Sequence, residues 1–307
     1  IIEGGPVAAP SVIAGAGAGI ALLVGALVLF TLMDAVAKYL GGSYHPVQVV
    51  WARFMVNAAV LVVIFRARVP RLIRSTQPGV QLVRALSQLA TVILFFAAIR
   101  EIGLAQAAAL TDLNPVLISL GAALFLGERL GPRRLIGIAV AFLGAMIILR
   151  PDRMIGAGVV DPAALFALAA AFSYAAGALL TRVVRADGLA TSMLWSAFVG
   201  GALSTLALPF VWSPLALADL PVFLALGLLG TAGQGLLILA FSRAEASVLA
   251  PFGYLGLVFS SLWGILFFAQ WPDRWTVIGA LVIVAAGLYV WARERASAAK
   301  DRAEPPA

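Results

Sequence analysis

Long apolar segments, separated by short gaps rich in charged residues, proline and glycine, make up most of this chain. A helix needs about 20 apolar residues to cross the ~30 Å hydrocarbon core of a bilayer, and each segment approaches that length. The pattern predicts ten membrane-spanning helices, at residues 19–40, 46–66, 79–99, 104–126, 132–149, 161–184, 190–211, 219–241, 247–269 and 275–292. Because the gaps are short, we expect one all-α integral membrane domain, with a flexible lead at 1–18 and a tail at 293–307.

The composition supports a membrane environment and excludes several classes of function. Hydrophobic residues make up 63% of the chain and charged residues 11%, with a mean hydropathy of +1.04, so polar side chains are too few to cover a soluble globule. With no cysteine and a single histidine, His45, the chain lacks the residues for a thiolate or histidine metal site. No glycine is followed by Lys-Ser or Lys-Thr, which excludes an ATP-binding phosphate loop. We therefore expect no metal, no cofactor and no catalytic residues.

The distribution of basic residues predicts the orientation in the membrane. Of the 21 Lys and Arg residues, 14 fall on one side of the predicted spans, five fall on the other, and Arg53 and Arg84 lie within spans. The positive-inside rule places the richer side, and with it both termini, in the cytoplasm, as in a multi-pass protein of the bacterial inner membrane. The net charge of +7 is thus explained by topology, and nucleic acid is not an expected partner.

An internal repeat divides the predicted spans into two sets of five. When the segment 98–149 is moved forward by 142 residues, identical residues coincide at Ser119/Ser261, Leu120/Leu262, Leu124/Leu266, Phe125/Phe267, Ile136/Ile278 and Gly137/Gly279. We expect the repeats to cover 19–150 and 160–292. Because five is odd, the second copy enters the membrane from the other side, and inverted repeats are typical of carriers that work by alternating access.

Several motifs in the first repeat resemble a known family. The runs Leu113-Asn114-Pro115-Val116 and Leu126-Gly127-Glu128-Arg129-Leu130, with Arg53-Phe54 earlier, resemble the EamA signature of the drug/metabolite transporter superfamily. In the second repeat the Asn-Pro step becomes Gly256-Leu257 and the Gly-Glu step becomes Ala269-Gln270, which puts equivalent roles in doubt. The resemblance implies a ten-helix transporter without ATP. The length and the ten spans are similar to bacterial amino-acid and metabolite exporters, of which the YddG type, which exports aromatic amino acids, is the nearest.

Three ionisable residues near the outer ends of the first two spans are candidates for function. Asp34 and Lys38 are four residues apart with the acid first, the favourable order for an ion pair on one helix face. Arg53 enters the membrane from the same side on the second span. One interpretation is a structural pair with a snorkelling arginine. The other is an outer gate or a site for a substrate carboxylate, because charges inside a membrane are costly and often functional.

Asp112 lies near the middle of the fourth span, beside Asn114 and Pro115. Proline cannot donate to the helix ladder, so we expect a break here, with exposed backbone groups that bind water or substrate. Asp112 either satisfies this break locally, or contacts the substrate amino group or carries a coupling proton. Tyr254 occupies the equivalent position of the ninth span at the offset of 142. Further neutral polar residues at similar depth are interpreted either as helix-packing contacts or as cavity lining: Gln88, Tyr174 and Gln234.

These features predict a secondary transporter that exports a small metabolite, with aromatic or other neutral amino acids favoured. One alternative is a carrier of nucleotide sugars or other anionic metabolites, which needs a basic cavity at the midplane. The alternative from another class is an intramembrane lipid-modifying enzyme, which needs acid and base groups clustered at one interface. The sequence shows no such cluster, so we do not expect an enzyme. A small-molecule substrate and membrane lipids are the expected partners, and the sequence is compatible with a monomer or a homodimer.

Overall fold

A computed structural model describes residues 11–126, 132–149, 162–244 and 246–303, which include the ten apolar helices expected from the sequence. Nine segments of 19–27 residues are long and apolar enough to span a membrane, and a shorter apolar helix covers Leu135–Leu149. The main helices are α1 (Ser11–Gly41), α2 (Pro46–Phe65), α4 (Pro78–Glu101), α5 (Leu104–Thr111), α6 (Asn114–Leu126), α7 (Pro132–Leu149), α9 (Pro162–Val183), α10 (Leu189–Ala207), α11 (Leu220–Arg243), α12 (Ala246–Gly253), α13 (Leu255–Phe268) and α14 (Arg274–Ala303). A four-residue helix, α3 (Val69–Leu72), lies between α2 and α4. The predicted fold class, an all-α integral membrane protein, is therefore confirmed.

Most boundaries lie within a few residues of the predicted spans, but both terminal helices are longer than expected. The first helix begins at Ser11 rather than at residue 19, and the last continues to Ala303 rather than ending at 292. The Leu-Gly-Glu-Arg-Leu motif lies outside the described residues apart from the backbone of Leu126, which ends α6.

The fourth and ninth spans are each divided into two helices, as the proline in each suggests. The N–H of Asp112 donates to the carbonyl oxygen of Ala108 at 2.9 Å and closes α5, and α6 then begins at Asn114 with Pro115 as its second residue. In the ninth span, the break falls at Tyr254, three residues after Pro251. The two breaks are thus 142 residues apart, the offset of the sequence repeat.

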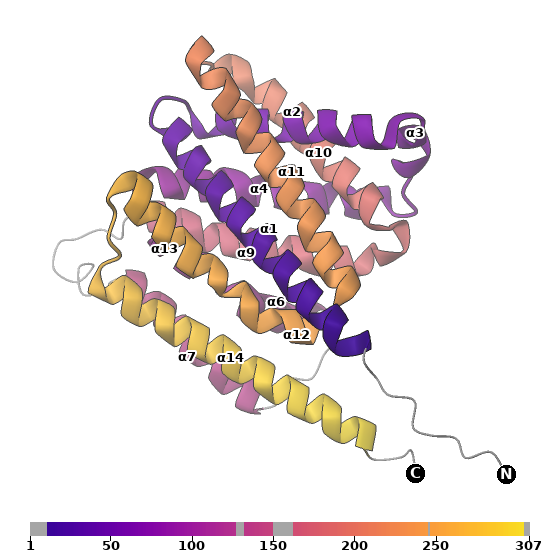
Figure 1. The fold of residues 1–307 in the computed structure, drawn as a ribbon, viewed down its shortest axis with the longest axis vertical. Helices are drawn as coiled ribbons and strands as arrows, with labels where there is room; N and C mark the ends of the chain where they lie inside the picture. Colours follow the sequence, from indigo (N-terminus) through magenta and orange to yellow (C-terminus); the bar gives the residue numbers. More distant parts are fainter. Residues whose placement is uncertain (1–10, 127–131, 150–161, 245, 304–307) are drawn as a thin grey trace.

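The helix packing has the symmetry expected of two inverted repeats. The most extensive contacts join α1 to α11 and α4 to α9, which are equivalent pairs if α1 corresponds to α9 and α4 to α11. A third extensive contact joins α7 to α14, the last helix of each repeat, and these two lie side by side at one edge of the molecule (Figure 1). The two repeats therefore interlock, since the first and third helices of each pack against the other.

Close packing between α7 and α14 reproduces the repeat offset at the level of single residues. A Cβ atom on Gly279 would lie 2.5 Å from the side chain of Ile148, and one on Gly137 would contact the side chain of Val290. Gly137 corresponds to Gly279, and Ile148 to Val290, at the offset of 142. The contact of Gly279 with Ile148 is therefore the symmetry equivalent of the contact of Gly137 with Val290. Both glycines are needed for the close approach of the two helices, because a larger residue would clash there.

In the first two helices of each repeat the offset is 144 residues. Trp51 and Phe54 on α2 then coincide with Trp195 and Phe198 on α10. The two indoles have similar roles, because each donates a hydrogen bond of 3.0 Å to the other repeat: Trp51 to Thr205 Oγ1, and Trp195 to the Ile73 carbonyl oxygen.

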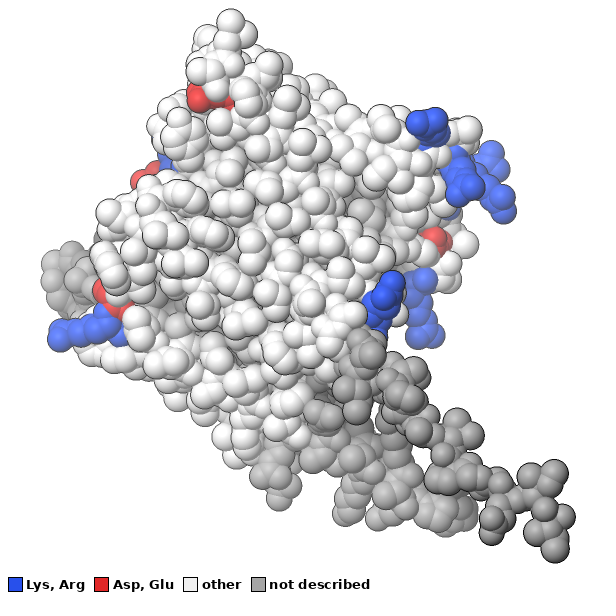
Figure 2. Space-filling model, viewed as in Figure 1, with Lys and Arg blue, Asp and Glu red and all other residues white. Residues whose placement is uncertain are grey.

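The surface is divided as in a membrane protein. Charged side chains lie toward the edges of the view in Figure 2, and an uncharged band separates them. Large apolar side chains such as Leu124, Phe125 and Leu281 are 64–80% exposed, which suits contact with lipid. We call the side where α1 begins and α14 ends, with the connections 66–77 and 184–188, the terminal face (lower right and right in Figure 1). The opposite face carries the connections 42–45, 102–103, 208–219 and 269–273.

Candidate substrate cavity

A cavity of about 550 Å³ lies between the repeats, within the size range of small-molecule sites. Its walls come from α1, α2, α4, the α5–α6 break, α9, α10 and α11. It runs from side chains in the middle of these helices to Thr181 and Leu189, which are exposed at the terminal face. The cavity is therefore accessible from that face.

Six of the nine residues predicted to bind substrate or line a cavity contribute to these walls: Asp34, Arg53, Gln88, Asn114, Tyr174 and Gln234. They come from six different helices, four in the first repeat and two in the second, which the sequence alone leaves unconnected. The other three predicted residues lie elsewhere.

Asp34 and Arg53 bring opposite charges to the same cavity from neighbouring helices. They do not form a salt bridge in the described structure. The Arg53 guanidinium instead lies 5.6 Å from the centre of the Phe96 ring, a distance suited to a cation–π contact. A charge at this depth requires a polar partner or water. Asp34 and Arg53 together are therefore suited to bind a ligand that carries one positive and one negative charge.

Neutral acceptors lie next to this charged pair. Asn57, one turn along α2 from Arg53, and Asn114 at the helix break both line the cavity. The side-chain carbonyl oxygen of each is buried and has no hydrogen-bond partner among the described residues. Leaving a buried acceptor unpaired costs free energy, so a bound donor such as an ammonium group would be stabilised by these oxygens. Asn57 was not among the residues predicted from the sequence, although its spacing of four residues from Arg53 was a usable signal.

Arg84 also lines the cavity, but its guanidinium is already bound to protein groups. Its Nε donates to Gln81 Oε1 at 2.9 Å, and its Nη2 donates to Ser196 Oγ at 2.9 Å and to the Ser192 carbonyl oxygen. The bonds to Ser192 and Ser196 join α4 to α10. Arg84 therefore has fewer donors left for a substrate than Arg53, for which the structure records the ring contact.

Lys38 does not line the cavity, and the described structure shows no ion pair between Lys38 and Asp34, which was one of the two interpretations of their spacing. The lysine is buried nearer the end of α1, where its Nζ donates to the carbonyl oxygens of Ile99 and, at 2.8 Å, Ile102. Helical spacing places Asp34 and Lys38 on one side of α1, but the unpaired carbonyls at the end of α4 provide a nearer partner.

Asp112 and Tyr254 lie at the two helix breaks, beside the cavity and not in its walls. Asp112 Oδ2 is buried without a partner in the described structure, so the carboxyl does not satisfy the break through a local hydrogen bond of this atom. Tyr254 lines a second, smaller cavity of about 120 Å³ with Pro115 and Ser119, and its hydroxyl packs against Gly287. The two side chains are close enough to interact electrostatically.

Hydrogen bonds tie a loop of one repeat to the other repeat at the opposite face. The Tyr44 hydroxyl donates to Asp219 Oδ2 at 2.8 Å and accepts from the Ala216 N–H at 3.0 Å. Gln48 donates to the Ser213 carbonyl oxygen at 2.8 Å and accepts from the Ser213 N–H at 3.0 Å. The connection 208–219 is therefore held against the beginning of α2.

A related contact joins two loops at the terminal face. Asp187 accepts hydrogen bonds from the Thr76 N–H at 2.8 Å, the Thr76 hydroxyl at 2.7 Å, Gln81 Nε2 at 3.0 Å and the Ser75 hydroxyl. These donors, the Ser75 hydroxyl first, hold the pKa of the Asp187 carboxyl well below its usual range. Both faces thus have a loop tie between repeats, and the cavity mouth lies beside the tie at the terminal face.

Several known transporters are similar to this chain. The pseudopaline exporter CntI of Pseudomonas aeruginosa is 32% identical over 282 residues, which cover 87% of this chain and 94% of the exporter. An S-adenosylmethionine uptake transporter of Rickettsia bellii is 27% identical over 92% of this chain and 96% of its own length. A riboflavin transporter of Rhizobium johnstonii is 36% identical over 62% of each protein.

The fold and the family model agree with these similarities. A solved structure with 22% sequence identity covers 89% of this chain and 96% of its own chain with a TM-score of 0.57, which supports the fold alone. The model of the EamA-like transporter family matches residues 17–150 and again 161–292. The resemblance seen in the sequence motifs is confirmed, and the chain belongs to the EamA-like transporter family.

Proposed function

We propose that this transporter exports a small zwitterionic metabolite, with amino acids as the favoured substrates, by alternating access. The observation that carries the proposal is the placement of Asp34, Arg53 and the unpaired oxygens of Asn57 and Asn114 around one cavity. A carboxylate fits the planar donors of Arg53, and an ammonium group fits Asp34 and the amide oxygens.

The apolar part of the cavity suits the side chain of such a substrate. Phe30, Phe54, Phe95 and Tyr174 contribute rings to the walls around the polar groups. Aromatic rings bury a large area and stack on flat or apolar groups, which favours neutral and aromatic amino acids over strongly polar ones. A cavity of about 550 Å³ is large enough for an amino acid with an aromatic side chain.

Export is favoured by the relative named as an exporter, which matches over 94% of its length at 32% identity. Another relative, at 27% identity, is named for uptake. If the terminal face is cytoplasmic, as the positive-inside rule suggests, the cavity is open to the compartment from which an exporter takes its substrate.

The principal alternative, a carrier of anionic metabolites, is less well supported by the cavity. Such a substrate requires more than one basic group available at the binding depth. Arg53 is one, but Arg84 is bound to Gln81, Ser192 and Ser196. The carboxylate of Asp34 in the same walls would also repel an anion.

Counterflow in proteoliposomes tests the proposal directly. Vesicles preloaded with unlabelled phenylalanine are mixed with radiolabelled phenylalanine, and we expect accumulation that is lost in Asp34→Asn and Arg53→Gln. Arg68→Gln removes a basic residue from the exposed connection after α2 and serves as the control, with normal counterflow expected. If neither phenylalanine nor any other amino acid shows counterflow with the wild-type protein, amino acids are not the substrates.

A further inference from the structure

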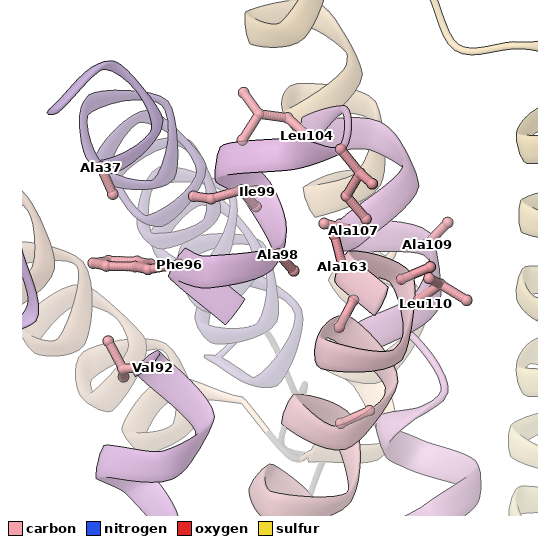
Figure 3. Packing of buried hydrophobic residues seen from close by; sticks show 14 of the residues in the cluster. Ala37, Val92, Phe96, Ala98, Ile99, Leu104, Ala107, Ala109, Leu110 and Ala163 are labelled. Carbon is pink, nitrogen blue, oxygen red and sulfur yellow. The ribbon is translucent and has the colours of Figure 1, made fainter. Parts of the chain in front are cut away.

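At the opposite face, Lys38 forms a contact that joins α1 to the end of α4. Its Nζ donates to the carbonyl oxygens of Ile99 and Ile102, and the side chain is 7% exposed. These carbonyls lie at the C-terminal end of α4. The carbonyl oxygens in the last turn of a helix have no N–H partner within the helix itself. Figure 3 shows Ala37 on α1 near Phe96 and Ile99 on α4 in the same packed cluster. The contact therefore closes the opposite face between two helices that line the cavity.

The equivalent helix end in the second repeat has the same geometry. Whereas α4 ends at Glu101 with Ile102 in an extended conformation, α11 ends at Arg243 with Ala244 extended, 142 residues later. The N–H of Ile102 donates to Ala98, and that of Ala244 to Ala240, both at 3.0 Å. Phe241 and Ala244 are thus the counterparts of the two residues whose carbonyls bind Lys38.

The counterpart of Lys38 is also basic. At the offset of 144 that aligns the first helix of each repeat, Lys38 corresponds to Arg182 on α9. The same offset relates Phe30, Met33 and Asp34 of the cavity wall to Tyr174, Gly177 and Ala178. The offset of 144 residues is therefore supported by the cavity-lining residues as well as by the correspondence of Trp51 with Trp195 on the next helix.

The two counterparts have different surroundings in this structure. Lys38 is buried between α1 and α4, which are in direct contact. Arg182 is exposed at the terminal face, and between α9 and α11 lies the cavity, lined by Thr181 from one helix and Leu237 from the other. The structure thus has one closed and one open version of the same helix pair.

We propose that Arg182 closes the terminal face in the other state of the transport cycle by donating to the carbonyl oxygens at the C-terminal end of α11, those of Phe241 and Ala244. In that state Lys38 releases α4, so the two basic residues act as alternating latches on equivalent helix ends. Arg182 carries five N–H donors, and the carbonyls of a helix end are acceptors that favour a cation. The inference depends on the alternating access proposed above but not on the identity of the substrate.

The absence of cysteine from the sequence allows a clean cross-linking test. At the opposite face, a Cβ on Gly41 would lie 3.8 Å from the Cβ of Arg100, a separation suited to a disulfide. The equivalent pair at the terminal face is Arg185 with Ser242. In detergent, without substrate, we expect Gly41→Cys/Arg100→Cys to cross-link rapidly and Arg185→Cys/Ser242→Cys slowly. Single-cysteine variants and reversal by reductant are the controls.

The latch residues are then changed in each cysteine pair. Lys38→Met, which keeps the aliphatic stem, should slow the Gly41–Arg100 cross-link and speed the Arg185–Ser242 cross-link by about fivefold, the effect of about one net hydrogen bond. Adding Arg182→Ala should remove that acceleration, and adding Arg182→Lys should largely retain it. A Lys38→Met effect that is the same with and without Arg182 would overturn the proposal.

A second measurement keeps the test independent of whether Lys38→Met folds. In the Gly41→Cys/Arg100→Cys protein with Lys38 unchanged, Arg182→Ala should speed the cross-link. The state with a closed terminal face then loses its latch, so the state with a closed opposite face is more populated. An unchanged rate there would also contradict the proposal. Since no substrate is present in these experiments, a failure of amino-acid counterflow leaves their outcome interpretable.

Discussion

The two repeats have equivalent helix contacts but different chemistry inside the membrane. In the first, Asp34, Lys38, Arg53 and Arg84 lie within helices and Asp112 lies at a helix break. In the second, Arg182, Arg243 and Arg274 lie at helix ends. At the offsets of 144 and 142 residues, four of these charged positions have uncharged counterparts: Asp34 and Ala178, Arg53 and Ala197, Arg84 and Leu226, and Asp112 and Tyr254.

The equivalent helix contacts follow from the symmetry of the repeats, whereas the charged residues of the first repeat correspond to what the proposed substrate requires. Equivalent helix contacts, such as those of Gly137 and Gly279, give the molecule two related ways to pack, which alternation between two faces needs. A single bound molecule does not share the symmetry of the repeats, so its charged contacts can come from one repeat only. The second repeat then contributes neutral groups, including Tyr174 and Gln234.

The largest expected effect is the loss of the cation at the binding site. Arg53→Ala should lower amino-acid counterflow by at least about 30-fold, because truncating one partner of a desolvated charge contact costs about 2–5 kcal/mol. The comparison predicts no such sensitivity for an exposed arginine of the second repeat, and Arg274→Ala is the control. Equal losses in both variants would remove the distinction between the repeats.

The symmetric contact between α7 and α14 should be sensitive to one added carbon atom. A Cβ on Gly279 would lie 2.5 Å from the carbonyl oxygen of Gly144, so Gly279→Ala should destabilise the protein by about 1–3 kcal/mol. Thermal unfolding in detergent measures the change. Gly235→Ala on α11 is the matched control, since its Cβ would have open space and should be neutral or slightly stabilising. A neutral Gly279→Ala would show that this close approach is not needed.

The pair of helix breaks offers a test of coupling. Asp112 carries an ionisable group where the second repeat has Tyr254, and Asp112 lies outside the cavity walls. We therefore expect it to carry a coupling proton rather than to contact substrate. Asp112→Asn should retain counterflow within about threefold, since no substrate contact of about 1 kcal/mol or more is lost, while accumulation driven by a pH gradient disappears. If gradient-driven accumulation persists, the coupling role is wrong.

The smallest effect concerns the loop tie at the terminal face. Hydrogen bonds from Ser75, Thr76 and Gln81 depress the folded-state pKa of Asp187, so its ionised form stabilises the folded protein above the unfolded pKa of about 3.9. That contribution is lost as the pH falls below this value toward the depressed folded pKa. Asp187→Asn should lower the unfolding temperature by a few degrees or less at pH 7, and the difference from wild type should narrow in acid. A difference independent of pH would contradict this origin.

Residue patterns predicted much of the fold because membrane helices depend on length and hydropathy, which are local properties. The break near Pro115 was also predicted, since proline removes a backbone donor wherever it occurs. Side-chain partners were harder to predict. The spacing of Asp34 and Lys38 is equally consistent with an ion pair on one helix and with two separate roles, and only the position of α4 decides between them.

The sequence by itself determined that the chain crosses the membrane as ten helices in two related sets, and that its ionisable residues are concentrated in the first set. The tertiary structure alone decided that Asp34 and Arg53 line the same cavity as Gln234, about 180 to 200 residues away, while Asp112 does not. It also decided which of two equivalent helix pairs is closed. The physical reason is that hydropathy acts along one helix, whereas cavity walls and side-chain partners depend on the distances between helices.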